Sequence, residues 1–241
     1  MAPVIATREL DRMEAGMAEG ARGVGGTILN IRGIGGSGKT ELARRILRAY
    51  GWPEAPGLVA ETRPGRRLPI AYRLPHPLGG RPLAVIGHYE RTCGGCDTIR
   101  AADGGLPLIF GLAAEFAAAG HDVLLEGLVL SREVRGTAAL AERHATHLIR
   151  LATPPDACAA NLAARRRLPG TARARLEDRA RADHAALLRA CAAVAELAPR
   201  VRVAALPFDP AQAHVLRLLG LEPVPESALP GAAEPADLSA T

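Results

Sequence analysis

The clearest chemistry in the chain lies in one glycine-rich octapeptide, Gly33-Ile34-Gly35-Gly36-Ser37-Gly38-Lys39-Thr40. It matches the pattern G-x-x-x-x-G-K-T in full, and it stands between an expected strand and an expected helix. Glycines let successive backbone N–H groups converge on phosphate oxygens, and the helix N-terminus adds partial positive charge. In this interpretation Lys39 reaches the β- and γ-phosphates of ATP and Thr40 ligates Mg²⁺. The residues assigned to phosphate binding are Gly33, Gly35, Gly36, Ser37, Gly38, Lys39 and Thr40.

Lysine usage singles out one member of this loop. Of the 30 lysine and arginine residues, a single one is lysine, and it is Lys39. A planar guanidinium cannot be wrapped by a tight glycine loop as a compact ammonium can. A composition that favours arginine everywhere else but keeps lysine here indicates that Lys39 is functional.

A second acidic position is expected where the apolar stretch 121–127 ends in Glu126-Gly127. This ending resembles the second acidic motif of nucleotide and small-molecule kinases more than the terminal aspartate of switch proteins. Glu126 would then hold Mg²⁺ through water or bind substrate, although an ordinary charged strand end is the alternative. The chain has no N-K-x-D motif for reading guanine.

A polar segment between the two phosphate motifs offers an acceptor site, His88-Tyr89-Glu90-Arg91-Thr92-Cys93-Gly94-Gly95-Cys96-Asp97-Thr98-Ile99-Arg100. Phosphoryl transfer to a hydroxyl needs a carboxylate that takes the proton and orients the oxygen. Asp97 is the candidate base. Its segment resembles the D-x-[FI]-R pattern of zeta-toxin-like and antibiotic phosphotransferases, which implies that Arg100 binds phosphate or substrate. A plain helix N-cap is the rival role for Asp97.

The pair Cys93 and Cys96 invites a metal or redox interpretation, which we do not favour. Zinc needs four ligands, and only His88 lies nearby in the sequence. We expect instead that the two intervening glycines permit close backbone approach to the acceptor.

Ten arginines lie between residues 161 and 202, among them Arg165, Arg166 and Arg167 just before Pro169-Gly170. Kinases related to nucleoside-monophosphate kinases carry such arginines on a lid that closes over the triphosphate. Consecutive helical residues point about 100° apart, so one or two can reach the phosphates. Arg165 is expected to bind the nucleotide and Arg166 to act in catalysis. The others could contact a nucleic-acid backbone, solvent or helical ion partners.

Composition bounds the class of protein. A chain of 241 residues is long enough for one sizeable α/β core. The net charge of +5 makes an anionic partner plausible. No apolar run reaches the ~20 residues that cross a bilayer, and the N-terminus lacks a secretory signal pattern. Four cysteines are too few for a disulfide scaffold. We expect a cytoplasmic protein with no membrane partner; the sequence leaves the oligomeric state open.

Alternating strands and helices must position these residues, and they predict an α/β fold with a parallel sheet flanked by helices. The ligand should bind beyond the C-terminal ends of the strands. Residues 1–26 are expected to form an N-terminal helix (7–19) and a spacer, 27–222 the kinase domain and 223–241 a disordered tail. The expected strands are 27–32, 68–74, 83–89, 121–127, 146–152 and 201–206, the second and third forming a hairpin. The expected helices are 40–50, 99–119, 136–144, 154–167, 172–197 and 211–219.

Residues 27–167 resemble bacteriophage P-loop kinases of thymine hypermodification, within the nucleotide kinase-like group of P-loop NTPases. The distinctive part is G-x-Y-x-x-x-C-G-G-C-D-T-I, residues 87–99, followed by Val123-Leu124-Leu125-Glu126-Gly127-Leu128. The resemblance implies an acceptor in DNA, the hydroxymethyl group of 5-hydroxymethyluracil. Tyr89, Tyr72 or Trp52 could stack on an extruded base or could be packing residues. A kinase for a nucleoside, nucleotide or antibiotic, and a nucleotide-binding ATPase without an acceptor, are the alternatives.

Overall fold

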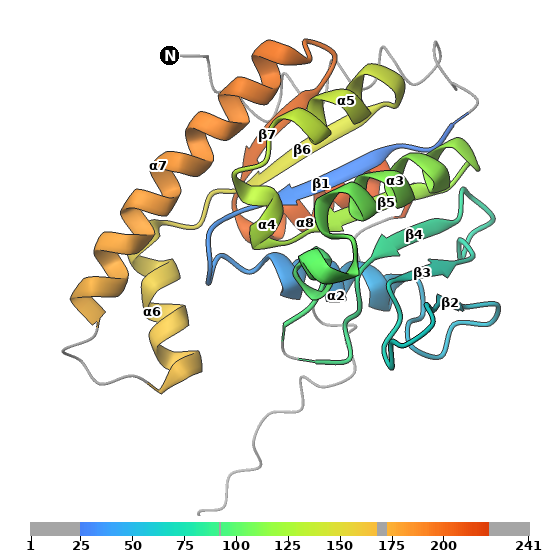
Figure 1. Ribbon diagram of the computed structural model, residues 1–241, viewed down its shortest axis with the longest axis horizontal. Coiled ribbons are helices and arrows are strands. Elements are labelled where there is room, and N and C mark those ends of the chain that lie inside the picture. Colours follow the sequence, from blue (N-terminus) through green and yellow to red (C-terminus); the bar gives the residue numbers. More distant parts are fainter. Residues whose placement is uncertain (1–24, 92, 168–172, 222–241) are drawn as a thin grey trace, which may run out of the picture.

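The structure is a computed structural model, and it describes residues 25–91, 93–167 and 173–221 (Figure 1). The helix expected at 7–19 and the tail from 223 lie outside the described residues. Within them, seven strands form one sheet in the order β2-β3-β4-β5-β1-β6-β7. The strands are β1 (Ile28–Arg32), β2 (Val59–Glu61), β3 (Ala71–Leu74), β4 (Leu83–Ile86), β5 (Asp122–Glu126), β6 (Thr146–Leu151) and β7 (Arg202–Leu206).

The sheet is mixed rather than wholly parallel. β4, β5, β1, β6 and β7 are parallel, whereas β3 runs antiparallel to β4 and β2 antiparallel to β3. The expected hairpin of β3 and β4 is present, and because β4 also pairs with β5 it belongs to the main sheet. β2 lies in the Pro- and Gly-rich stretch 51–67, outside the strands expected from the sequence.

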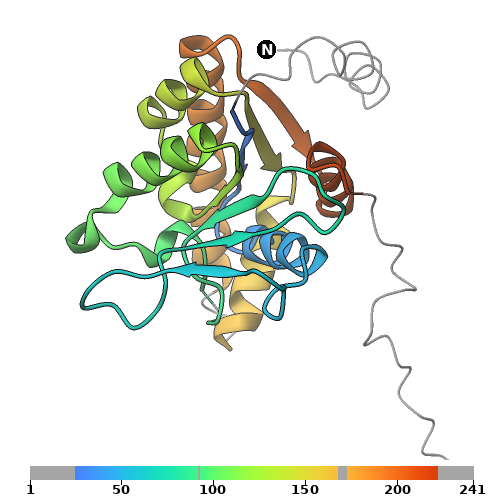
Figure 2. The ribbon, with the colours of Figure 1, turned by 90° about the vertical axis from the view of Figure 1, so that its right-hand side faces the viewer.

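Helices cover both faces of the sheet, with α2 and α8 on one face and α3, α5 and α7 on the other (Figure 2). Side chains alternate between these two cores along a strand: Leu29 and Ile31 pack on the α2 and α8 side, and Ile28 on the α3 side. The helices are α2 (Lys39–Ala49), α3 (Gly105–Ala118), α4 (Leu128–Ser131), α5 (Arg135–Arg143), α6 (Pro155–Arg166), α7 (Arg173–Leu197) and α8 (Phe208–Leu218).

The helix expected at 99–119 begins later, at Gly105. Before it, the 3-10 turns η1 (Cys96–Thr98) and η2 (Ala101–Asp103) redirect the chain. The four-residue helix α4, which follows β5, was not expected either.

The strand order indicates where a ligand would bind. β1 lies at the centre between β5 and β6, and later strands are added on both sides of it. In open α/β sheets the crevice for ligands lies at the C-terminal end of strands where the order reverses, and here that is the end of β1. None of the described helices has the length and apolarity needed to cross a membrane.

Candidate functional site

The loop between β1 and α2 is shaped by close contacts that only glycine permits. Gly36 and Gly38 have φ of 82° and 99°, which L side chains rarely adopt. A Cβ atom on Gly36 would lie 2.2 Å from the carbonyl oxygen of Cys158 on α6. From the same helix, Asn161 Nδ2 donates to the Gly36 carbonyl at 2.9 Å. The loop is therefore held against α6.

Lys39 lies inside this loop with 6% of its surface exposed. Its Nζ donates to the carbonyl oxygens of Gly33 at 2.8 Å and Ile34 at 3.1 Å. Burial lowers the pKa of Lys39, and the nearby carboxylates of Glu126 and Asp97 oppose that shift. The ammonium is thus buried, held by carbonyl oxygens and close to both candidate acids.

Glu126 ends β5 directly beside the start of α2. Its Oε2 accepts from Thr40 Oγ1 at 3.4 Å, while Oε1 is buried with no hydrogen-bond partner. Burial raises the pKa of Glu126 to about 7, and Lys39 opposes that shift. A hydroxyl next to a carboxylate with an unused oxygen suits Mg²⁺, which binds through one or two protein ligands and keeps several waters. No group of three or more His, Cys, Asp or Glu residues in the described chain could hold a metal by itself.

Asp97 lies in η1, at the end of a loop that leaves β4 and returns through a bridge between His88 and Gly95. Its Oδ2 accepts the backbone N–H of Leu128 at 2.8 Å, and its Oδ1 accepts that of Val129 at 2.9 Å. Asp97 therefore caps α4, a helix distant in sequence, and not its own segment. A carboxylate oxygen with one such bond keeps another acceptor position, and the side chain is exposed.

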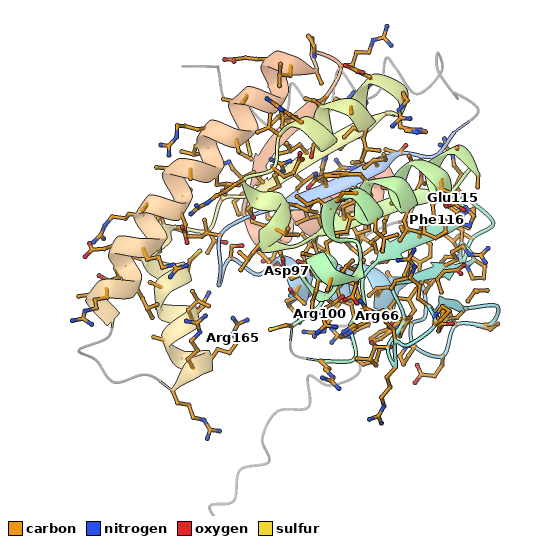
Figure 3. All side chains as sticks on the ribbon, viewed as in Figure 1. Arg66, Asp97, Arg100, Glu115, Phe116 and Arg165 are labelled. Carbon is orange, nitrogen blue, oxygen red and sulfur yellow. The ribbon has the colours of Figure 1, made fainter. Side chains whose placement is uncertain are left out.

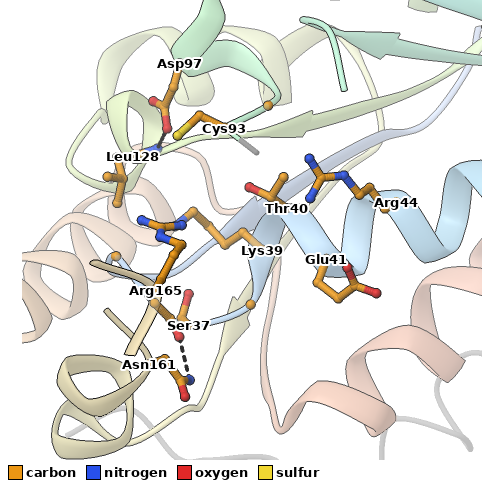
Figure 4. A pocket seen from close by; sticks show the side chains of 14 residues that line it. Ser37, Lys39, Thr40, Glu41, Arg44, Cys93, Asp97, Leu128, Asn161 and Arg165 are labelled. Carbon is orange, nitrogen blue, oxygen red and sulfur yellow. Dashed lines mark hydrogen bonds between the residues drawn. The ribbon is translucent and has the colours of Figure 1, made fainter. Parts of the chain in front are cut away.

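A cavity of about 330 Å³ joins these elements (Figure 4). From the sequence-based candidates it brings together most of the glycine loop, Asp97 and Arg165. Sequence reasoning missed Arg44 on α2 and Asn161 on α6, although helical spacing could have indicated both, since Arg44 lies four residues after Thr40 and Asn161 four residues before Arg165. The lining residues are Gly35, Gly36, Ser37, Gly38, Lys39, Thr40, Glu41, Arg44, Cys93, Gly94, Asp97, Leu128, Asn161 and Arg165.

Two expected arginines do not line this cavity. Arg100 is 78% exposed on its side chain and pairs through Nε with Asp103 at 3.1 Å (Figure 3). Arg166 is exposed and follows Arg165 on α6, so it points elsewhere. The geometry favours Arg165 over both as a ligand of phosphate.

Of the two roles left open for Tyr89, Tyr72 and Trp52, stacking on a base or packing, the structure favours packing. Tyr89 and Tyr72 are each 2% exposed. Trp52 is half-buried and meets Tyr72 edge to face, with ring centroids 6.2 Å apart. None of the three lines the cavity.

The two cysteines of the Cys93 to Cys96 segment differ in their exposure. Cys93 is exposed at the cavity, whereas Cys96 is buried with its Sγ 3.9 Å from the Ile86 carbonyl oxygen. The two glycines allow this loop to lie close to neighbouring segments: a Cβ on Gly94, which lines the cavity, would lie 3.2 Å from Thr40 Cγ2.

Fold and site together define a mixed α/β protein in which a central parallel strand runs into a glycine-rich loop beside two carboxylates. Over 140 residues the chain is 40% identical to a protein of Pseudomonas phage PaMx11 named 5-hmdU DNA kinase. The aligned part covers 58% of this chain and 69% of the phage protein. The chain belongs to the 5-hmdU DNA kinase family, as its sequence motifs indicated. No protein-family model and no solved structure matches it.

Proposed function

We propose that this protein is an ATP- and Mg²⁺-dependent P-loop kinase that phosphorylates the hydroxymethyl group of 5-hydroxymethyluracil in DNA. The observation that carries the proposal is that Lys39 and Asp97 line the same cavity in a chain related to a 5-hmdU DNA kinase. We assign the kinase domain to residues 27–222.

The glycine loop supplies the nucleotide half of the site. Its backbone N–H groups and the start of α2 surround the phosphates. The buried hydroxyl of Ser37 lacks a hydrogen-bond partner in the structure and provides one more polar group for them. Lys39 exchanges loop carbonyls for the β- and γ-phosphates, and Arg165 approaches from α6 as the lid residue. Thr40 and Glu126 would hold Mg²⁺, which neutralises charge on the phosphate oxygens.

Asp97 supplies the acceptor half. It accepts the proton of the hydroxymethyl group as the oxygen attacks the γ-phosphorus. The new O–P bond forms as the bond between the γ-phosphorus and the bridging oxygen breaks, and ADP leaves with that electron pair. Lys39 and Arg165 stabilise the charge on the transferring group.

A base in a stacked duplex cannot enter such a cavity, so the acceptor base must be extruded or single-stranded. The net charge of +5 favours the DNA backbone as a partner. Exposed arginines near the cavity, including Arg91 and Arg166, are available for backbone phosphates.

The test is phosphate transfer from γ-labelled ATP to matched acceptors. Oligonucleotides that contain 5-hydroxymethyluracil or thymine, single-stranded and duplex, are compared with the free hydroxymethyl nucleotide. We expect label in the hydroxymethyluracil oligonucleotides, none with thymine, and none with Lys39→Ala. Label only in the free nucleotide would replace the proposal by a small-molecule kinase. Label in no acceptor, with ATP still hydrolysed, would favour an ATPase.

A further inference from the structure

The cavity wall next to Asp97 contains an exposed apolar side chain that packing does not explain. Leu128 is 51% exposed at the start of α4, and the adjacent Val129 is 39% exposed. Apart from loop glycines, the cavity lining consists of charged or polar side chains except for Leu128 and Cys93. An exposed leucine at the mouth of a polar cavity suits a ligand that has an apolar surface.

The position of Leu128 is fixed relative to Asp97. The Leu128 backbone N–H donates to Asp97 Oδ2 at 2.8 Å, so the residue that carries this side chain is hydrogen-bonded directly to the candidate base. Cys93 comes from the loop that also carries Asp97, and Figure 4 shows Leu128 and Cys93 both beside the Asp97 side chain. Gly94 anchors this loop, because a Cβ there would lie 2.9 Å from the ring of Tyr89.

A pyrimidine ring has two apolar faces, and its 5-hydroxymethyl group projects from the ring edge. No aromatic side chain lines the cavity within the described residues. The faces of an extruded base would therefore contact aliphatic carbon and sulfur, while the ring edge turns toward a carboxylate. Leu128, Cys93 and Asp97 supply these three features together.

We propose that Leu128 and Cys93 form the base subsite of the acceptor, in which they contact the faces of an extruded 5-hydroxymethylpyrimidine and direct its hydroxymethyl group to Asp97. The identity of the base rests on the proposed function. The subsite itself is a binding site that can be tested without catalysis.

The first test compares Leu128→Ala with Leu78→Ala. Leu78 is 73% exposed in the turn between β3 and β4, away from the cavity, and serves as the matched control. For Leu128→Ala we expect KM for a hydroxymethyluracil oligonucleotide to rise about tenfold, and KM for ATP to change much less than that. For Leu78→Ala we expect neither constant to change. An unchanged KM for the oligonucleotide in Leu128→Ala overturns the proposal.

The second test uses alkylation of the unmodified protein by iodoacetamide. Cys93 is exposed whereas Cys96, Cys158 and Cys191 are buried, so Cys93 should react first. With ADP present throughout, a single-stranded hydroxymethyluracil oligonucleotide should slow Cys93 labelling at least fivefold, on the order expected for an occupied site, and a thymine oligonucleotide should slow it less. If the oligonucleotide protects Cys93 from alkylation but receives no phosphate, the result would support the subsite and contradict the proposed kinase function. Transfer without protection would keep the kinase and overturn the subsite.

Discussion

The backbone of Gly95 lies against the carboxylate of Glu126. A Cβ atom on residue 95 would be 2.4 Å from Glu126 Oε1 and 2.5 Å from the Glu126 carbonyl oxygen, and Gly95 has φ of 68°. Gly95 belongs to the loop that carries Asp97, whereas Glu126 contacts Thr40 at the start of α2. The contact therefore sets the spacing between the proposed acceptor side and the proposed metal side of the site.

Gly95→Ala should displace Glu126 and disable transfer. The methyl group must move either the loop or the carboxylate, and a shift of about 1 Å in such a site costs about 100-fold in rate. We expect kcat/KM to fall by about that factor, and the Mg²⁺ concentration for half-maximal rate to rise. Steady-state kinetics over a Mg²⁺ series checks both.

Gly79→Ala is the control for backbone strain. Gly79 has φ of 76°, but nothing lies within 4 Å of the position of its Cβ. The substitution carries a similar left-handed conformational cost of about 1 kcal/mol without the contact. If Gly79→Ala and Gly95→Ala lose activity equally, backbone strain, and not displacement of Glu126, explains the loss in Gly95→Ala.

Asp97→Asn should separate the capping role of Asp97 from its chemical role. Asparagine keeps one acceptor oxygen for the amides of α4 but cannot take the acceptor proton. We expect transfer to fall by about 10²–10⁴, ATP binding to be retained, and the free energy of unfolding to fall by about 1 kcal/mol. Labelled transfer, nucleotide titration and denaturant unfolding measure the three quantities.

Asp103→Asn serves as the comparison, because Asp103 also accepts a backbone N–H, that of Arg100 at 3.3 Å, but does not line the cavity. Asp103→Asn should lower the free energy of unfolding and leave the rate of phosphate transfer unchanged. If Asp97→Asn lowers stability alone, Asp97 is a helix cap and another group is the base.

Arg165→Ala and Arg166→Ala should differ sharply although the residues are adjacent. Arg165 lines the cavity, whereas Arg166 is exposed outside it. Loss of a charged contact to the transferring phosphoryl group costs about 2–3 kcal/mol, so kcat for Arg165→Ala should fall about 30- to 150-fold. Arg166→Ala should keep kcat within about twofold, and any weaker binding of DNA should be largest at low salt. A larger loss of kcat in Arg166→Ala than in Arg165→Ala would contradict the orientation of α6.

The parts of the site that follow from the sequence are the local ones. Lys39, Thr40 and their glycines lie in one continuous pattern between a strand and a helix. Glu126 is marked by the end of a buried strand, and the central sheet order makes that strand the neighbour of β1. Periodicity and one motif therefore identified these residues, and the strand order of the structure places them side by side.

The remaining features depend on contacts between distant segments. Asp97 finds its amide partners in α4, which no local pattern reveals. The D-T-I-R pattern suggested a role for Arg100, but the 3-10 turns orient it toward Asp103. Tyr89 and Tyr72 could have been stacking residues by type, yet both fill the core, and the apolar residue at the cavity is Leu128.

Stability should fall in acid because His147 on β6 is buried as the neutral ring. It is 5% exposed, and burial, with Arg202 and His214 nearby, lowers its pKa to about 3. The unfolded chain takes up this proton near pH 6.5 and the folded chain only near pH 3, so stability present above pH 6.5 is lost as the pH falls below it. Between pH 7.5 and 4.5, the free energy of unfolding should fall by about 2.5 kcal/mol more in the unmodified protein than in His147→Leu. Urea unfolding at both pH values measures this difference. As a control, His144→Leu, at a half-buried ring, should change this pH dependence less than His147→Leu does. If the free energy of unfolding falls by the same amount in the unmodified protein and in His147→Leu, then His147 is protonated in the folded state.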